Sequence, residues 1–380
     1  MTDDVAPEKT RDLARENAWL RLALIPGLGP LTVDKLVTAV GGDPQAIFDL
    51  PMNQLISIDG VGGERARRIA DPRGANRVDE ERAACHGAGV AIITRESPEY
   101  PRQLRELHDP PLALWMIGAF APRDRLSIGV VGPRRPSPYG HRQGHRLSLS
   151  LARLGACLVS GLARGIDTVA HEAALEAKGR TIAVLGSGFK SLYPEENRPL
   201  AQRIANGHGA TISEYPFAVP PMPGNFPRRN RIIAALSLAT LVIEAGARSG
   251  ALVTARLAGE LGRPALVLPG PIDNPECVGS NKLIRDGATL VTSVDDILEE
   301  VSPLMTLSKG SDPQPQENPR AAALSGRERQ VYLLLSDQPR NIDDLVRTGD
   351  FPASVASATL ISLELRRLAK RTPAGYVRAG

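Results

Sequence analysis

Three arginines crowd the start of a predicted helix in the segment PPMPGNFPRRNRIIAALS, residues 220–237. Pro227 suits the first turn of a helix, where its missing N–H is not needed. Arg228, Arg229 and Arg231 then fall at the N-terminal end, which already carries partial positive charge. Each added cation there costs about 0.3–1 kcal/mol unless an anion is present. The pattern therefore predicts a phosphate-binding site at this helix start.

The residues just before these arginines are suited to contacting a base. Gly224 and Asn225 lead to Phe226, in a chain whose aromatic content is only 4%. Stacking of a base on an aromatic ring contributes about 1–3 kcal/mol and tolerates any base, so it suits a single strand of any sequence. The alternative is that Phe226 is a buried hydrophobic staple for the same helix. Both roles stay open from the sequence.

Two other glycine-containing turns carry groups that suit an anion. In VVGPRRPSPYG, Gly132 ends a predicted strand and is followed closely by Arg134 and Arg135. A pair of solvated charges is the alternative reading of these arginines. In EAGARSGALVTARLA, Ser249 caps a predicted helix and Gly250 opens its first turn, which presents backbone N–H groups to an anion. A plain helix cap explains Ser249 as well.

A further turn, VSGLARGIDTVAH, combines two glycines with a cation. Gly161 and Gly165 allow a close backbone approach, so the turn amides can face a phosphate, and Arg164 projects from the turn. We expect Asp167 to cap the following helix rather than to act in catalysis. His171, one turn further along, is expected to be a buried, hydrogen-bonded histidine.

The motifs of the common nucleotide-binding and catalytic sites are absent. No GxGxxG follows the first strand, the GSG at 186–188 lacks a third glycine, and neither GxxxxGK[ST] nor GxSxG occurs. His141 and His145 are four residues apart but lack an HExxH pattern and a third ligand. Glu214 and Glu244 end neighbouring strands, where hydrogen bonding to a loop is the commoner use. We therefore expect no catalytic residue, cofactor or metal.

Apolar runs that alternate with helical segments must position these turns. Continuous apolar strands that end in glycine or a polar turn are typical of a parallel sheet buried on both faces. Residues 91–305 are therefore predicted to form an α/β, extended Rossmann-like, doubly wound and mostly parallel sheet, with ligands at the carboxyl ends of its strands. The runs are LSIGVVG, CLVSG, TIAVLG, ATISEY, ATLVIEA, PALVLPG and ATLVT.

Three further segments flank this domain. Residues 1–90 are predicted to form a helical domain of helix-hairpin-helix type, because LIPGLGPLTVDKLV and ISIDGVGGERARRIA repeat a glycine turn before a helix. Such turns either accept a phosphate or simply let helices pack closely. Residues 306–322 are predicted to be a linker, and residues 323–380 a winged helix that either binds a DNA groove or is a packed or protein-binding module. The cations of its third helix are Arg366, Arg367, Lys370 and Arg371.

Composition limits the compartment and the partners. Hydrophobic residues make up 42% and charged residues 23% of the 380 residues, as in a folded globular protein. The formal net charge of +4 permits a polyanionic partner. The three cysteines lie far apart, and no apolar run approaches the roughly 18 residues that a membrane helix needs. The N-terminal residues are charged where a secretion signal needs an apolar stretch, so we expect a cytoplasmic protein with no membrane partner.

Several of these segments, in chain order, carry a family resemblance. They are VVGPRRPSPYG, VSGLARGID, TIAVLGSG, the run YPEEN, FPRRNRIIAALS, RSGALVTA and LPGPIDNPECVGSNKLIRDGA. Together they resemble the bacterial DNA-processing protein A family, also called Smf, over residues 95–291. The resemblance implies a Rossmann-type domain that binds single-stranded DNA, forms a homodimer and loads the RecA recombinase in natural transformation.

Position by position, the resemblance also implies a DNA pocket. Pro133 departs from the family, which usually has Ser or Thr there, and Pro223 stands where some relatives have a lysine. The implied pocket residues are Arg134, Gly224, Asn225, Phe226, Arg228, Asn230 and Arg231.

The combined prediction is a non-catalytic protein that binds single-stranded DNA, protects incoming DNA and loads RecA in competence and recombination. Its affinity should fall with salt, with a log–log slope of about −0.7 per phosphate neutralised. Two alternatives remain. One is a Rossmann-like nucleotide hydrolase, although EAGARSGALVTA lacks the PGGxGT turn of such enzymes. The other is a duplex-DNA-binding regulator that acts through the winged helix.

Overall fold

The computed structural model describes residues 5–308, 324, 326–335, 340–349, 352–365, 368–372 and 375–378. The chain divides into two compact units, Met1–Leu307 and Ser308–Gly380. The predicted linker begins inside helix α13 (Val294–Ser308), and its residues 309–322 lie outside the described residues.

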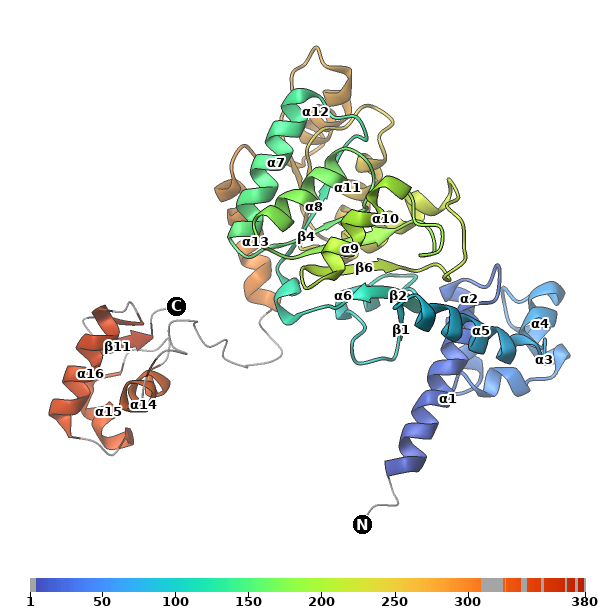
Figure 1. Ribbon diagram of the computed structural model, residues 1–380, viewed down its shortest axis with the longest axis horizontal. Coiled ribbons are helices and arrows are strands. Elements are labelled where there is room, and N and C mark those ends of the chain that lie inside the picture. Colours follow the sequence, from blue (N-terminus) through green and yellow to red (C-terminus); the bar gives the residue numbers. More distant parts are fainter. Residues whose placement is uncertain are drawn as a thin grey trace. The chain divides into compact units, whose positions relative to one another are not determined.

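A nine-stranded sheet forms the centre of the first unit in the described part of the chain (Figure 1). Its strand order is β1-β2-β6-β5-β4-β3-β7-β8-β9. The strands from β6 to β9 in this order pair in parallel, whereas β1 and β2 add an antiparallel edge beside β6. The strands are β1 (Ala91–Thr94), β2 (Ala113–Gly118), β3 (Ser127–Val131), β4 (Cys157–Ser160), β5 (Thr181–Leu185), β6 (Gly209–Ser213), β7 (Ala239–Val242), β8 (Ala265–Val267) and β9 (Thr289–Leu290).

Helices cover both faces of this sheet because each central strand buries both of its sides. Along β3, Ile128 and Val130 enter one apolar cluster with α7, α8 and α13, while Val131 enters another with α10 and α11. The predicted doubly wound, mostly parallel fold is confirmed. The helices are α6 (Arg102–Arg105), α7 (Pro138–Arg153), α8 (Ile166–Glu176), α9 (Arg198–Ala205), α10 (Asn225–Leu236), α11 (Gly250–Glu260) and α12 (Val278–Arg285), with short 3-10 helices η2 (Pro122–Arg125), η3 (Glu195–Asn197) and η4 (Pro275–Cys277).

A helical domain precedes the sheet within the same unit. Its own apolar core includes Trp19 and Leu36, and it is tied to the sheet by Trp115, whose Nε1 donates to Glu81 Oε1 at 2.7 Å. The two predicted glycine turns lie together, because Arg68 Nη1 donates to Pro26 O at 2.6 Å. The elements are α1 (Val5–Ala23), α2 (Pro30–Ala39), η1 (Ala46–Asp49), α3 (Met52–Ser57), α4 (Gly63–Ile69) and α5 (Gly74–Gly87).

The second unit has three helices followed by a hairpin, where the winged-helix prediction had a single small strand after the helices. The elements are α14 (Gly326–Leu334), α15 (Ile342–Gly349), α16 (Ala353–Leu365), β10 (Ala369–Thr372) and β11 (Gly375–Arg378). Its core gathers Val331, Leu345, Leu360 and Tyr376. Arg366 and Arg367, predicted to end the third helix, lie outside the described residues.

Candidate functional site

An open groove of about 1200 Å3 follows the carboxyl edge of the parallel strands. It lies where the chain leaves β3 through α7 and leaves β7 through α11, on opposite faces of the sheet. Such a switch point opens a crevice because the two connections diverge. Its walls include Gly132, Arg134 and Arg135 after β3, Phe226 and Asn230 of α10, and Arg248, Ser249 and Gly250 before or in α11.

The predicted site residues divide between the groove and its surroundings. Arg134, Phe226, Asn230, Ser249 and Gly250 line the groove. Gly161 and Arg164 line a small side pocket that shares Arg134 and Phe226 with it. Gly224, Asn225, Arg228 and Arg231 line neither.

Three exposed arginines give the groove its positive charge. Arg134 and Arg135 follow β3, and Arg248 immediately precedes the Ser249 cap. Within the described residues none of the three forms an ion pair with a carboxylate. The three guanidinium groups line the groove without an ion-pair partner among these residues, although the Glu276 side chain belongs to the same wall. Arg248 was not predicted as a site residue, although its place one residue before a helix cap at the sheet edge is a usable signal.

Phe226 presents its ring to the groove at the start of α10, which begins at Asn225, so that Pro227 lies in its first turn as predicted. The Arg134 guanidinium carbon lies 5.6 Å from the ring centroid. The ring also packs against Gly186, where an added Cβ would lie 2.8 Å from Phe226 Cδ1. The half-buried Phe226 ring is thus supported by Gly186 and also lines the groove, as a stacking surface requires.

Arg229 makes its contacts within the protein, so the prediction that it contributes to a phosphate-binding site is wrong. Its side chain is buried, and its Nη1 donates to Gly161 O at 2.6 Å and to Val184 O. Burial lowers the pKa of Arg229, and the nearby Asp167 opposes that shift. Arg229 therefore joins the ends of β4 and β5 to α10.

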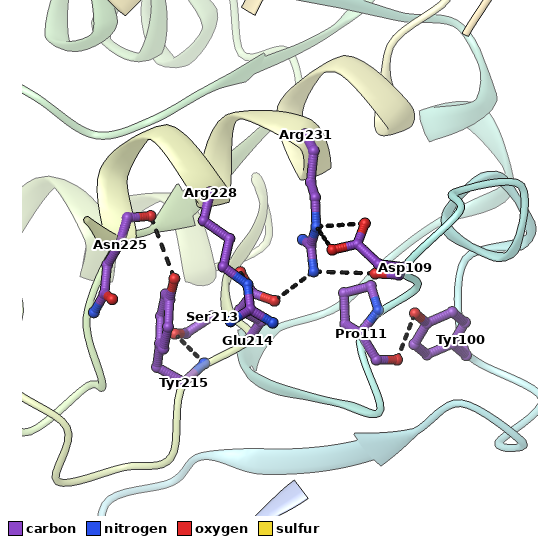
Figure 2. A network of polar contacts seen from close by, with 9 residues as sticks. All are labelled: Tyr100, Asp109, Pro111, Ser213, Glu214, Tyr215, Asn225, Arg228 and Arg231. Atoms are coloured by element: carbon purple, nitrogen blue, oxygen red, sulfur yellow. Dashed lines mark hydrogen bonds and ion pairs between the residues drawn. The ribbon is translucent and has the colours of Figure 1, made fainter. Parts of the chain in front are cut away.

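Arg231 is also engaged by the protein itself (Figure 2). Its Nε lies 2.9 Å from Asp109 Oδ2, and its Nη2 lies 2.7 Å from Glu214 Oε2. The side chains of Arg231 and Glu214 are only 8% and 5% exposed. A direct phosphate contact by Arg231 does not fit this geometry, because two carboxylates already neutralise it. Arg228 is different, since it is 47% exposed and its Nε is 3.7 Å from Glu214 Oε1.

The turn after β4 uses its amides internally, against the prediction for Gly161. The N–H groups of Gly161 and Ala163 donate to Asp167 Oδ2 at 3.1 and 3.2 Å. Gly161 is needed for space instead, because a Cβ there would lie 2.2 Å from an Arg229 nitrogen. His171 is buried as predicted, with its Nδ1 2.7 Å from Thr181 Oγ1.

The remaining predicted groups have structural partners. Ser249 Oγ accepts from Ala251 N at 3.3 Å, so it caps α11. Asn230 Nδ2 donates to Gly250 O at 3.4 Å and connects α10 with α11. Glu244 is fully buried and accepts from Ser137 N at 2.9 Å, so it supports the loop after β3 and does not pair with Glu214.

Tyr193 is a groove residue that sequence reasoning did not assign. It lines both the groove and the side pocket, and its ring centroid lies 5.8 Å from that of Phe226. The low aromatic content of the chain was the available signal. Within the described residues, no three His, Cys, Asp or Glu side chains are placed to hold a metal ion. In the same residues, no helix combines the length and apolar character that crossing a bilayer requires.

These features define an α/β protein with an arginine-lined groove at the carboxyl edge of a mostly parallel sheet. Residues 91–302 match the family model of DNA recombination-mediator protein A, and residues 314–375 match the DprA winged helix domain. The chain belongs to the DNA recombination-mediator protein A family.

Curated relatives and solved structures agree with this family. The chain is 42% identical to Protein Smf of Escherichia coli K12 over 294 residues, which covers 76% of this chain and 77% of the relative. It is 31% identical to Protein Smf of Synechocystis, covering 93% and 96%. The crystal structure of DNA processing protein A from Streptococcus pneumoniae is similar, with a TM-score of 0.64, 33% identity, and 75% and 97% of the two chains covered. The Helicobacter pylori structure, which concerns a single-stranded DNA binding mode, has a TM-score of 0.50 and 31% identity, covering 57% and 96%.

Proposed function

We propose that this chain binds single-stranded DNA in the groove of its first unit without catalysing a reaction on it. The observation that carries the proposal is the exposed trio Arg134, Arg135 and Arg248 beside the open ring of Phe226. Guanidinium groups bind backbone phosphates, and an aromatic ring stacks on a base whose face is free. Bases of a duplex are stacked on each other, so this combination favours a single strand.

The roles of the site residues follow from their positions. Arg134, Arg135 and Arg248 bind phosphates from inside the groove, while the exposed Arg228 contacts the strand as it leaves. Arg231 positions α10 and does not touch DNA. Asn230 and the backbone at Ser249 and Gly250 add polar contacts along the same wall, and the GNF loop, residues 224–226, presents the Phe226 ring.

A titration of single-stranded and duplex DNA at several salt concentrations tests the proposal. We expect tighter binding of the single strand, and Arg134→Ala should reduce the log–log salt slope by about 0.7, as one lost phosphate contact predicts. Arg153→Ala is the matched control, because Arg153 is exposed in the last turn of α7, at the opposite edge of the sheet. Equal losses in the two variants would assign binding to net charge alone.

We further propose that the chain acts as a homodimer that protects incoming DNA and loads the RecA recombinase in natural transformation and recombination in the cytoplasm. The family membership supports this role. The test is RecA assembly on single strands that are already covered by a competing single-strand-binding protein. The chain should accelerate assembly, and Arg134→Ala should remove the effect at a concentration where the unchanged protein is active. Light scattering should give twice the 40.6 kDa chain mass.

A further inference from the structure

A second aromatic ring stands beside Phe226 on a well-anchored segment. Leu192 and Pro194 are buried on either side of Tyr193, and Asn197 Nδ2 donates to Leu162 O at 2.8 Å. Tyr193 itself is 37% exposed. The segment is thus fixed by its neighbours, and the tyrosine ring is the part left facing the groove and the side pocket.

The two rings meet edge to face and not in parallel. Their planes differ by 63° at a centroid distance of 5.8 Å. Two rings at this angle cannot stack on the same base, because stacking needs parallel planes. A strand that passes both rings therefore presents one base to Phe226 and another to Tyr193.

Arg164 lies over Tyr193 and forms an exposed ion pair with Glu196. Its guanidinium pairs with the Glu196 carboxylate, with Nη2 at 2.8 Å from Oε2. Its Cζ lies 5.9 Å from the tyrosine ring centroid, near the limit of about 6 Å for a cation–π contact. At this distance the cation orients the ring without covering it in van der Waals contact.

We propose that Tyr193 is a second base-stacking surface, so that the groove holds two unstacked bases of one strand, the first on Phe226 and the second on Tyr193. The inference rests on the proposed single-strand binding and adds to it a specific base contact. The second base stacks on the part of the Tyr193 ring that faces the groove. The side pocket between Arg134, Arg164, Phe226 and Tyr193 has a volume of about 10 Å3, which is too small to take a base.

The test compares Tyr193→Leu with Tyr193→Phe on two ligands, oligothymidylate and a sugar-phosphate strand of the same length without bases. Tyr193→Leu should weaken oligothymidylate binding roughly 5- to 150-fold, the range that corresponds to one stacked base. Its binding of the abasic strand and its salt slope should stay unchanged, because no phosphate contact is lost. Tyr193→Phe should bind both ligands as the unchanged protein does, since the hydroxyl is not needed for stacking.

The outcomes separate the inference from the proposed function. Equal weakening on both ligands, or no weakening on either, overturns the role of Tyr193 while single-strand binding stands. No binding of oligothymidylate by the unchanged protein overturns both. Photocrosslinking of the unchanged protein to a 5-iodouracil strand provides a measurement that does not depend on the folding of a variant. A crosslinked peptide carrying Tyr193 is expected, and crosslinks confined to other residues overturn the inference.

Discussion

Arg231→Ala removes the cation between two carboxylates that lie on different elements. Of its ion pairs within the described residues, Glu214, which is 5% exposed, would keep the longer one with Arg228. Breaking a buried ion pair by deleting one member typically costs about 3–5 kcal/mol, because the remaining charge stays desolvated. Arg228→Ala removes an ion pair at 3.7 Å whose arginine is 47% exposed, so at most about 1 kcal/mol is lost. Arg231→Ala should therefore mainly lower the stability of the unit, whereas Arg228→Ala should mainly weaken the binding of DNA.

Tryptophan fluorescence provides the assay, since both tryptophans of the chain, Trp19 and Trp115, lie in the first unit. We expect thermal unfolding of Arg231→Ala at least about 6 °C below that of the unchanged protein, from about 2 °C per kcal/mol for a unit of this size. Arg228→Ala should unfold within about 3 °C of it but bind single strands with a smaller salt slope.

The double variant Arg231→Met with Glu214→Gln is the control for this reasoning. It removes both charges and keeps most of the side-chain volume, so it should recover part of the stability lost in Arg231→Ala. If Arg231→Ala unfolds like the unchanged protein and lowers the salt slope, then Arg231 binds phosphate and the structural role assigned to it is refuted.

Four further outcomes follow from the structure. Burial lowers the pKa of His171 to about 3, against about 6.5 in the unfolded chain. Between these two pH values the unfolded chain binds a proton at His171 that the folded protein does not bind. The contribution of His171 to the free energy of unfolding therefore falls as the pH drops. In His171→Leu, the decrease in the free energy of unfolding from pH 7 to pH 5 should be smaller by about 2 kcal/mol, as measured by denaturant titration at both pH values. Burial raises the pKa of the Cys277 thiol to about 11, and all three cysteines are buried, so alkylation followed by mass spectrometry should label them only after unfolding. Gly186→Ala should displace the Phe226 ring and weaken oligothymidylate binding at an unchanged salt slope, because the new Cβ would lie 2.8 Å from the ring. Deletion of residues 309–380 should leave single-strand affinity unchanged, since the groove lies in the first unit, and a selective loss of duplex binding would assign that activity to the winged helix.

The fold was predictable because its signals are local and repeat along the chain. Apolar runs such as TIAVLG, ended by glycine, became buried parallel strands, and the carboxyl-edge rule led to the turns that line the groove. Arg134 and Ser249 come directly after or near such strand ends, so their position at this edge follows from chain order alone.

The direction of each arginine in the FPRRNR segment was not predictable, because it depends on partners that are distant in the sequence. Arg231 pairs with Asp109, which is 122 residues away, and Arg229 donates to Gly161, 68 residues away. The helix dipole makes cations at a helix start unfavourable, but it does not predict which carboxylates or carbonyl groups other elements bring to that place. Arg228 has only the longer ion pair with Glu214, at 3.7 Å, and its side chain is 47% exposed.

The buried arginines still bear on how a polyanion is held. Arg229 and Arg231 fasten α10 to the ends of β4, β5 and β6. This fixes the start of α10, and with it the ring of Phe226, before any ligand arrives. A rigid ring loses little conformational entropy when a base stacks on it, so more of the stacking free energy appears as affinity. In the proposed binding mode, Arg134, Arg135 and Arg248, which form no ion pair in the described residues, contact the phosphates. The buried Arg229 and Arg231 hold α10 in place instead.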